Sequence, residues 1–272
     1  MTFQRQVIVS GGFDDIRTRD LRFLEESAKL GELTVMLWSD ETLRKLTGTA
    51  PKFPLAERQY LLNAVRYVGK VVPAEVIIDP DKLPADWRAD IWADRKAATN
   101  TLRRKSCIGR HISYRVFKPG EMKGFPKLSP TPSVAGRKKV VVTGCYDWFH
   151  SGHVRFFEEV SAYGDLYVVV GHDANIRKLK GLGHPLRLQE ERRYVVGSIK
   201  YVKQALISTG VGWLDADPEI RELKPDIYAV NEDGDQGGKR EYCATQGIEY
   251  LVLKRTPATG LPRRSSTDLR GY

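Results

Sequence analysis

The C-terminal half of the chain alternates short apolar runs with stretches of helical periodicity. Val140 to Val142 form a continuous apolar run that ends at Thr143-Gly144, which is typical of a strand buried in a parallel sheet. Apolar residues then recur at helical spacing over residues 150–162, which predicts a helix. The alternation continues, with strands predicted at 166–170, 202–207 and 249–253 and a helix at 189–199. Strands interleaved with helices predict βαβ crossovers, and therefore an α/β fold with a parallel sheet flanked by helices.

The N-terminal half repeats this pattern. The repeat begins with VIVSGGFDDIRTRDLRFLEESAKLGELTVML from Val7, which aligns with VVVTGCYDWFHSGHVRFFEEVSAYGDLYVVV from Val140. Later matches include ADIWA with PDIYA and ISYRV with IEYLV. Because each copy is far longer than the repeat of a solenoid, we expect two complete Rossmann-like domains in tandem, each with its own core.

The segment between the copies has the composition of a linker. Residues 118–137 are rich in proline, glycine, serine and lysine and lack apolar periodicity. We therefore expect a linker there, between a domain of residues 1–117 and a domain of residues 138–272. A chain of 272 residues with 41% hydrophobic content can fill two such cores.

Charge and cysteine usage narrow the classes of partner and compartment. The net charge is +10, and the basic residues are mixed with 34 acidic ones. This balance suits nucleotides and phosphate esters, although the net charge by itself would equally suit RNA or DNA. Three cysteines without a CxxC pair argue against a disulfide framework or a zinc knuckle. No apolar run is long enough to span a bilayer, so we expect a cytoplasmic location and no membrane partner.

The candidate chemistry lies where the first strand of the second copy leads into its helix. His150 and His153 flank Ser151-Gly152 at the predicted helix start, on the sheet edge where such folds bind ligands. Helix N–H groups and the helix dipole favour phosphate there, and Gly152 allows close backbone approach. Histidines three residues apart share one helical face, so both can donate hydrogen bonds to one cluster of phosphate oxygens. The spacing therefore predicts charge neutralisation in phosphoryl or nucleotidyl transfer.

Two other interpretations of the histidine pair stay open. The imidazoles could ligate zinc, although no third cysteine, histidine or carboxylate stands at a supporting spacing. They could also be surface residues that cap the helix. The position at the end of a strand favours phosphate chemistry over both.

A resemblance to a known family rests on the segment GCYDWFHSGHVRFFEEVSAYGDLYVVVGHD. This segment is similar to the opening of the cytidylyltransferase-like nucleotidyltransferase superfamily, whose signature is G-x-F/Y-D-x-x-H-x-G-H. The resemblance covers most of residues 138–270. The family's closing signature is echoed by Arg255-Thr256-Pro257 and then by Arg264-Ser265-Ser266-Thr267, with an insertion around residues 258–263 between the two pieces.

The resemblance implies roles for individual side chains. The imidazoles would stabilise the transition state, a lysine would hold phosphates, and the cationic hydroxyl segment would clasp the triphosphate. The implied catalytic residues are His150, His153, Lys180 and Arg264. The implied nucleotide-binding residues are Gly144, Tyr146, Asp147, Gly152, Asp173, Lys178, Arg192, Ser265, Ser266 and Thr267. Arginine forks, lysine charges and hydroxyl donors are independently suited to phosphate.

Some of these residues have an alternative role. Whichever of Lys178 and Lys180 does not hold phosphate would lie in a solvated loop. Asp147 either orients a backbone amide or a histidine, or it only forms the turn.

A polar loop after the predicted strand at residues 227–230 resembles the acceptor-side or base-side loop of the family. We assign Asn231, Asp233 and Lys239 in this loop to acceptor binding. A flexible solvent loop is the alternative.

The first copy lacks the chemistry of the second. Arg17-Thr18-Arg19-Asp20 stand where the second copy has His150 to His153, and no RSST-like segment closes the first half. We expect a degenerate domain kept for packing, for regulation or for completing the site, in which Arg17 and Arg19 could still bind an anion. Tandem copies with one damaged copy resemble the eukaryotic ethanolamine-phosphate cytidylyltransferases, although this chain is shorter and its second copy is the intact one.

These observations predict a nucleotidyltransferase. The expected reaction transfers a nucleoside monophosphate, with CMP from CTP and Mg²⁺ as first candidate, to a phosphorylated alcohol or sugar and releases pyrophosphate. An adenylyltransferase that uses ATP is the nearest alternative, and a non-catalytic nucleotide sensor or scaffold is another. Nucleic acid is not expected as a partner, and no residues are assigned to a metal site. The acceptor, and the choice between a homodimer and an intramolecular pseudo-dimer, stay open.

Overall fold

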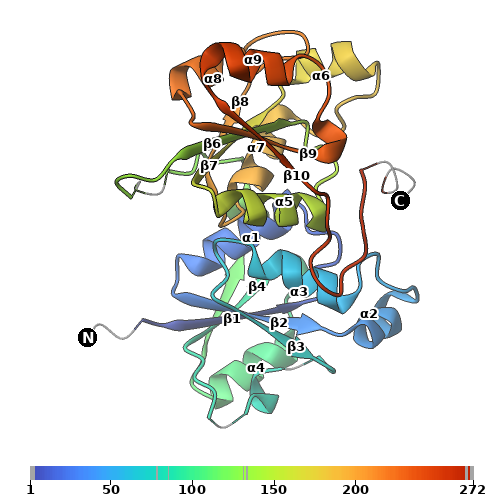
Figure 1. The fold of residues 1–272 in the computed structure, drawn as a ribbon. Helices are drawn as coiled ribbons and strands as arrows, with labels where there is room; N and C mark the ends of the chain where they lie inside the picture. Colours follow the sequence, from blue (N-terminus) through green and yellow to red (C-terminus); the bar gives the residue numbers. More distant parts are fainter. Residues whose placement is uncertain are drawn as a thin grey trace. The chain divides into compact units, whose positions relative to one another are not determined.

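The structure is a computed structural model that describes residues 4–77, 79–84, 86–130, 132, 134–266 and 269. The chain divides into two compact units, residues 1–124 and 125–272. The division lies inside the segment predicted as a linker. Each unit is a five-stranded parallel sheet flanked by helices (Figure 1). The predicted α/β class with two Rossmann-like sheets is therefore confirmed.

The first unit has the strand order β3-β2-β1-β4-β5. The strands are β1 (Gln6–Gly11), β2 (Glu32–Trp38), β3 (Lys70–Ala74), β4 (Ile91–Arg95) and β5 (Ser113–Phe117). The helices are α1 (Thr18–Ala28), α2 (Asp40–Thr47), α3 (Leu55–Asn63) and α4 (Thr101–Gly109), with short 3₁₀ turns η1 (Pro80–Lys82), η2 (Lys96–Ala98) and η3 (Pro119–Met122).

The second unit has the corresponding order, β8-β7-β6-β9-β10. The strands are β6 (Lys139–Gly144), β7 (Asp165–Val170), β8 (Val202–Ile207), β9 (Ile227–Asn231) and β10 (Glu249–Leu253). The helices are α5 (Ser151–Ser161), α6 (Asp173–Lys180), α7 (Gln189–Gly197), α8 (Asp217–Leu223) and α9 (Lys239–Gln246), with the 3₁₀ turn η4 (Glu232–Gly234).

The repeat seen in the sequence extends to strand register. Val7 in β1 pairs with Ile91 in β4, and Val140 in β6 pairs with Ile227 in β9. Both central strands are buried because helices cover both faces of a parallel sheet, which explains the continuous apolar runs. The two halves therefore use the same residues of the repeat to build the same sheet.

The sheet topology of the second unit includes a reversal of strand order beside β6. The chain leaves β6 toward β7 on one side, whereas β9 lies on the other side. Ligands of open parallel sheets bind beyond the carboxyl ends of the strands at such a reversal. The segment 145–153 follows β6 at that point. No helix in the described parts of the chain is long and apolar enough to cross a bilayer.

Candidate active site

A cavity of about 380 Å³ opens beyond the carboxyl ends of β6 and β9 in the second unit. It gathers residues from segments far apart in the chain, and eleven of them are site residues expected from the sequence. Those eleven are Gly144, Tyr146, His150, Gly152, His153, Lys180, Asn231, Asp233, Lys239, Ser265 and Ser266. The histidine motif and the closing serines therefore face a single cavity.

The two histidines form a capping box at the start of α5. His150 is the N-cap, and its Nδ1 accepts the backbone N–H of Gly152 at 3.1 Å. His153 reaches back, and its Nδ1 accepts the backbone N–H of His150 at 3.3 Å. A ring nitrogen that accepts carries no proton, so the proton of each neutral ring stays on Nε2. The same side chain can therefore cap the helix through Nδ1 and donate a hydrogen bond through Nε2. Helix capping, the alternative raised from the sequence, thus does not exclude phosphate chemistry.

The environment of His153 keeps its ring neutral. Burial lowers the pKa of His153 well below its usual value, and His150, Arg255 and Lys180 lower it further. The ring still borders the cavity, and its protonated nitrogen therefore offers a neutral donor.

Aromatic rings and small residues hold the imidazoles in place. Phe149 stacks on His153 at a centroid distance of 5.4 Å, and Tyr146 meets the same ring edge-on at 5.3 Å. At Gly152 an added Cβ would lie 2.9 Å from Cε1 of His150. At Gly144 an added Cβ would lie 2.7 Å from the ring of Tyr146. The glycines thus leave room for the side chains that position the histidines.

Cationic and hydroxyl side chains line the cavity beside the histidines. Lys180 reaches the cavity from the last residue of α6, whereas Lys178 is exposed and does not line it. Ser265 and Ser266 line the cavity from the C-terminal segment. Thr267 lies outside the described residues.

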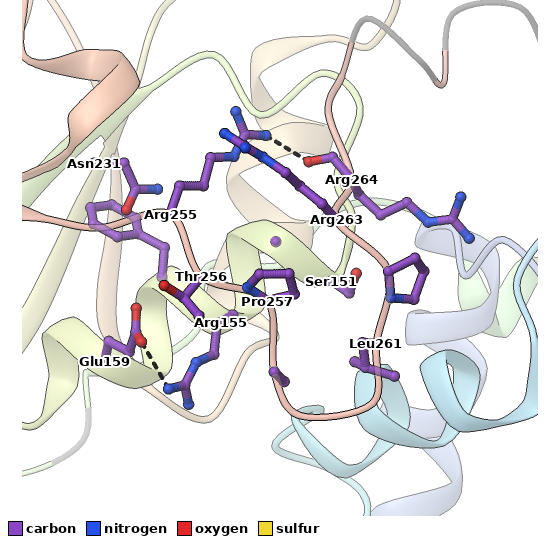
Figure 2. A pocket seen from close by; sticks show the side chains of 14 residues that line it. Ser151, Arg155, Glu159, Asn231, Arg255, Thr256, Pro257, Leu261, Arg263 and Arg264 are labelled. Atoms are coloured by element: carbon purple, nitrogen blue, oxygen red, sulfur yellow. Dashed lines mark hydrogen bonds and ion pairs between the residues drawn. The ribbon is translucent and has the colours of Figure 1, made fainter.

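Arg255 lines the cavity, although the sequence-based assignment gave the catalytic role to Arg264. The guanidinium of Arg255 donates to the carbonyl of Arg264 at 2.6 Å and pairs with Asp233. Figure 2 shows the side chain of Arg264 directed away from Arg255, beside a second, smaller pocket between α5 and the inserted segment. Because the insertion forms its own loop, the arginine that follows it does not line the cavity of the histidines. The position of Arg255 two residues after the end of β10, at the start of the closing signature, was the signal that could have identified it.

The loop after β9 supplies the opposite wall. Asn231 ends β9, and its Oδ1 is buried without a hydrogen-bond partner among the described residues. The ammonium of Lys239 donates to the carbonyl of Gly234 at 2.6 Å, and burial lowers the pKa of Lys239. All three residues predicted for the acceptor therefore border the cavity, with Asp233 already paired to Arg255.

Arg192 and Asp173 have structural contacts instead of a place in the cavity. Arg192 is 1% exposed, and its guanidinium donates to the carbonyls of Arg187, Cys145 and Gly171 and to the carboxylate of Asp173. These bonds use the donor capacity that a phosphate would need. The predicted nucleotide-binding role of Arg192 is therefore corrected to that of a brace between the loops at the sheet edge.

Asp147 holds a loop rather than a histidine. Its two oxygens accept the backbone N–H groups of Leu186 and Arg187 at 2.8 and 2.9 Å. Of the two roles that the sequence left open, the structure places the carboxylate on backbone amides. Asp147 also borders an adjoining lobe of about 160 Å³, together with Trp148 and His184. This lobe shares His153 and Lys180 with the main cavity, so a second ligand group could lie beside the first.

The donor set does not fit a metal ion held by the protein. Within the described parts of the chain, no three His, Cys, Asp or Glu side chains lie close enough together to hold one. Asp233 lines the cavity, but its carboxylate is paired with Arg255. Magnesium prefers carboxylates and phosphate oxygens, and the cavity walls present mainly N–H and O–H donors.

The first unit keeps the fold of this region and changes its charge. Asp20 stands at the position of His153 and still accepts the backbone N–H of the N-cap residue, Arg17, at 3.0 Å. Its other oxygen pairs with Arg95, which occupies the position of Asn231. Arg17 is itself paired with Asp15. The helix cap is therefore retained, while a carboxylate that repels phosphate replaces a neutral donor.

The second half of the chain is similar to several known proteins. A family model described as cytidylyltransferase-like matches residues 141–270. An FAD synthase from Ferroglobus placidus (strain DSM 10642 / AEDII12DO) is 37% identical over 120 residues, 43% of this chain and 75% of that protein. A bifunctional protein HldE from Campylobacter concisus (strain 13826) is 33% identical over 118 residues, 42% of this chain and only 24% of that protein. The solved structure of a lipopolysaccharide core biosynthesis protein from Thermoplasma volcanium GSS1 is 24% identical, covers 45% of this chain and 99% of that chain, and has a TM-score of 0.38.

Proposed function

Because this chain belongs to the cytidylyltransferase-like family of nucleotidyltransferases, we propose that the cavity at β6 and β9 transfers a nucleoside monophosphate to a small phosphate monoester and releases pyrophosphate. One observation carries the proposal. His150, His153, Lys180, Arg255 and the two serines border a single cavity. Together they offer neutral and cationic donors, which a triphosphate needs on several sides at once.

The reaction proceeds by direct displacement. An oxygen of the acceptor phosphate attacks the α-phosphorus of the nucleoside triphosphate, the bond from that phosphorus to the bridging oxygen breaks, and pyrophosphate leaves. No covalent enzyme intermediate is needed. The Nε2–H groups of His150 and His153 donate to the oxygens on which charge builds, and Lys180 and Arg255 neutralise the leaving pyrophosphate.

The acceptor binds beside the nucleotide. Asn231 and Lys239 border one side of the cavity, and Trp148 and His184 border the adjoining lobe. An acceptor phosphate between these groups would lie near Lys180, which borders both spaces. A phosphorylated alcohol or sugar is of suitable size for a lobe of about 160 Å³.

Magnesium would enter with the triphosphate. Among the described residues no set of carboxylates could hold it, and Mg²⁺ commonly binds through substrate phosphates. The ion would supply charge neutralisation to the phosphates, and the described side chains do the remaining positioning.

CTP is the nucleotide that the sequence signature suggests, and ATP is the second candidate. FAD carries an adenylyl group, and the relative from Ferroglobus placidus is an FAD synthase. The name of the family model points to cytidylyl transfer instead. Both nucleotides share the triphosphate, so the choice depends on contacts to the base.

The test is pyrophosphate release with each of the four nucleoside triphosphates, Mg²⁺ and a panel of phosphate monoesters. The panel contains phosphoethanolamine, phosphocholine, glycerol phosphate, sugar phosphates and FMN. Release with CTP alone supports cytidylyl transfer, and release with ATP alone supports adenylyl transfer. Nucleotide binding without turnover across the panel would favour a sensor. A His153→Ala variant with full turnover would overturn the assigned roles even if the reaction itself were found.

A further inference from the structure

Another cavity of the second unit lies at the amino ends of the strands, at the edge of the sheet opposite the candidate active site. Its volume is about 280 Å³, and it is lined by residues that begin or precede β6, β7 and β8, including Arg137, Asp165 and Lys203. The active-site cavity lies at the carboxyl ends of the same sheet. Strand β7 has six residues, so the two cavities are separated by about 20 Å of strand. A ligand of the second cavity would therefore not be a group of the nucleotidyl-transfer reaction.

Lys203 is the residue that makes this cavity unusual. Its side chain is 6% exposed, although lysine is almost never buried without a close partner. The ammonium lies 3.4 Å from Asp165 and makes no hydrogen bond to any other described residue. A buried ammonium with three N–H donors is costly unless those donors are satisfied. Lys203 lines the cavity, so a ligand there could accept them.

The one carboxylate near Lys203 is shared. Asp165 also pairs with Arg137 at 3.3 Å, and Lys200 lines the same cavity. The described lining residues thus include three cationic side chains and a single acidic one. The cavity retains an excess of positive charge that a dianion would neutralise.

The pairing of β7 with β8 directs Lys203 into this cavity, and the fold does not require a lysine at this position. Leu166 pairs with Val202, whereas Tyr167 pairs with Gln204, so Lys203 lies at an irregularity between β7 and β8. Such bulges redirect a side chain and often accompany functional sites. In the first unit Gly69, directly before β3, stands at the corresponding position, and that unit forms the same sheet without a lysine at this position.

We propose that this cavity is a second anion site, which binds a phosphate group through Lys203, Arg137 and Lys200. The ligand class is a small phosphate ester or free phosphate, because the charge excess matches a dianion and the volume admits a phosphate with a short organic part. The site is independent of the nucleotidyl-transfer site. A bound phosphate would accept hydrogen bonds from the buried ammonium of Lys203 and so stabilise the second unit.

The test uses calorimetric titration of the full chain with inorganic phosphate. The starting protein carries Lys180→Met and Arg255→Met, which weaken phosphate binding in the catalytic cavity. This protein should still bind one phosphate. Adding Lys203→Met should weaken that binding at least about tenfold, because charge-assisted hydrogen bonds are lost. Lys105→Met, the same change at an exposed position of the first unit, should leave the affinity unchanged.

A second substitution separates binding from a structural role. Asp165→Asn removes the carboxylate that competes with the ligand, so phosphate should bind several-fold more tightly. A purely structural ion pair would give weaker binding or none in this variant. Absence of phosphate binding in the starting protein, equal affinity after Lys203→Met, or weaker binding after Asp165→Asn would each overturn the proposal. A glycerol phosphate titration then distinguishes an ester from free phosphate.

Discussion

His150 and His153 each use Nδ1 to cap the start of α5. Their Nδ1 atoms accept backbone N–H groups in the first turn of α5, which holds both rings and directs Nε2 away from the backbone. In the first unit Asp20 performs the same capping without an imidazole. At the scale of single residues, helix capping is thus separable from the catalytic role that we propose for the imidazoles.

Substitution of His150 by asparagine or alanine should separate the two functions. The Oδ1 of asparagine occupies about the place of Nδ1 and can cap the helix, but no group replaces Nε2–H. We expect His150→Asn to lose about 10²- to 10³-fold in kcat with little change in stability. His150→Ala should lose similar activity and, in addition, about 1 kcal/mol of stability. Pyrophosphate release and urea unfolding measure the two effects, and equal stability of both variants would contradict the capping role.

The lowered pKa of His153 predicts a dependence of stability on pH. The folded chain keeps this ring neutral, whereas the unfolded chain protonates it near the ordinary pKa of about 6.5. Below that pH the unfolded state binds more protons, so the free energy of unfolding falls as the pH falls. Between pH 6.5 and 5, the free energy of unfolding of the wild type should fall by up to about 1.4 kcal/mol per pH unit more than that of His153→Gln. Urea unfolding at pH 7.5, 6.0 and 5.0 tests this, and parallel curves for the two proteins would refute it.

At the scale of elements, the start of α5 depends on the absence of a side chain at Gly152. An added Cβ there would lie 2.9 Å from Cε1 and 3.0 Å from Nδ1 of His150. The loop that carries Ser265 and Ser266 is close as well, because the carbonyl of Arg264 would lie 3.6 Å from that Cβ. The helix start, the imidazole and the closing segment thus share one small space.

Gly152→Ala should displace the His150 ring by a few tenths of an ångström. We expect kcat to fall by about tenfold or more while the fold is retained, because catalysis is sensitive to small errors of position. Gly109→Ala is the matched control, since an added Cβ there meets nothing within 4 Å. Its activity should equal that of wild type. Unchanged turnover in Gly152→Ala would show that His150 is not held as described.

The inserted segment separates two arginines that we expect to differ in catalytic importance. Arg255 borders the histidine cavity, whereas Arg264 contributes its backbone carbonyl to Arg255 and borders the smaller pocket (Figure 2). Arg255→Ala should therefore reduce kcat/KM by about 10²-fold or more, whereas Arg264→Ala should reduce it by less than about tenfold. Steady-state pyrophosphate release measures both. The reverse order would return the catalytic role to Arg264.

At the scale of the whole molecule, both units keep one buried arginine that ties their loops to the sheet edge. Arg58 donates to the carbonyls of Phe53, Gly12 and Trp38 and pairs with Asp40. Arg192 has the equivalent contacts in the second unit. The retention of this brace in a copy without the histidines identifies it as a requirement of the fold.

Removal of either brace should destabilise one unit. Each unit has its own core, so we expect Arg58→Met to lower the stability of the first unit, and Arg192→Met that of the second, by about 3 kcal/mol each. Hydrogen exchange measured on peptides from each unit reports the two stabilities separately. Loss of protection in both units from a single substitution would contradict independent folding.

The local pattern of the chain was sufficient for the architecture. The apolar run at Val140 to Val142, the helical spacing after His150 and the internal repeat predicted two parallel sheets, and the observed strands and helices agree. The histidine motif also predicted a ligand site where a strand end leads into a helix start, and a cavity lies at that position. The position is defined by neighbouring residues, and ligand binding there stays a prediction. Such features depend on periodicity and short spacings, which are properties of the sequence itself.

The partners of individual side chains were decided only by the tertiary structure. Arg192 fell in the order of a family motif, yet backbone carbonyls enclose its guanidinium. Arg264 matched the closing signature, yet it is Arg255 that lines the cavity of the histidines. The cavity around Lys203 left no motif in the sequence at all. Each of these outcomes depends on which distant segments converge and on where long side chains point. Burial and charge around a side chain are set by that convergence, which spacing along the chain does not encode.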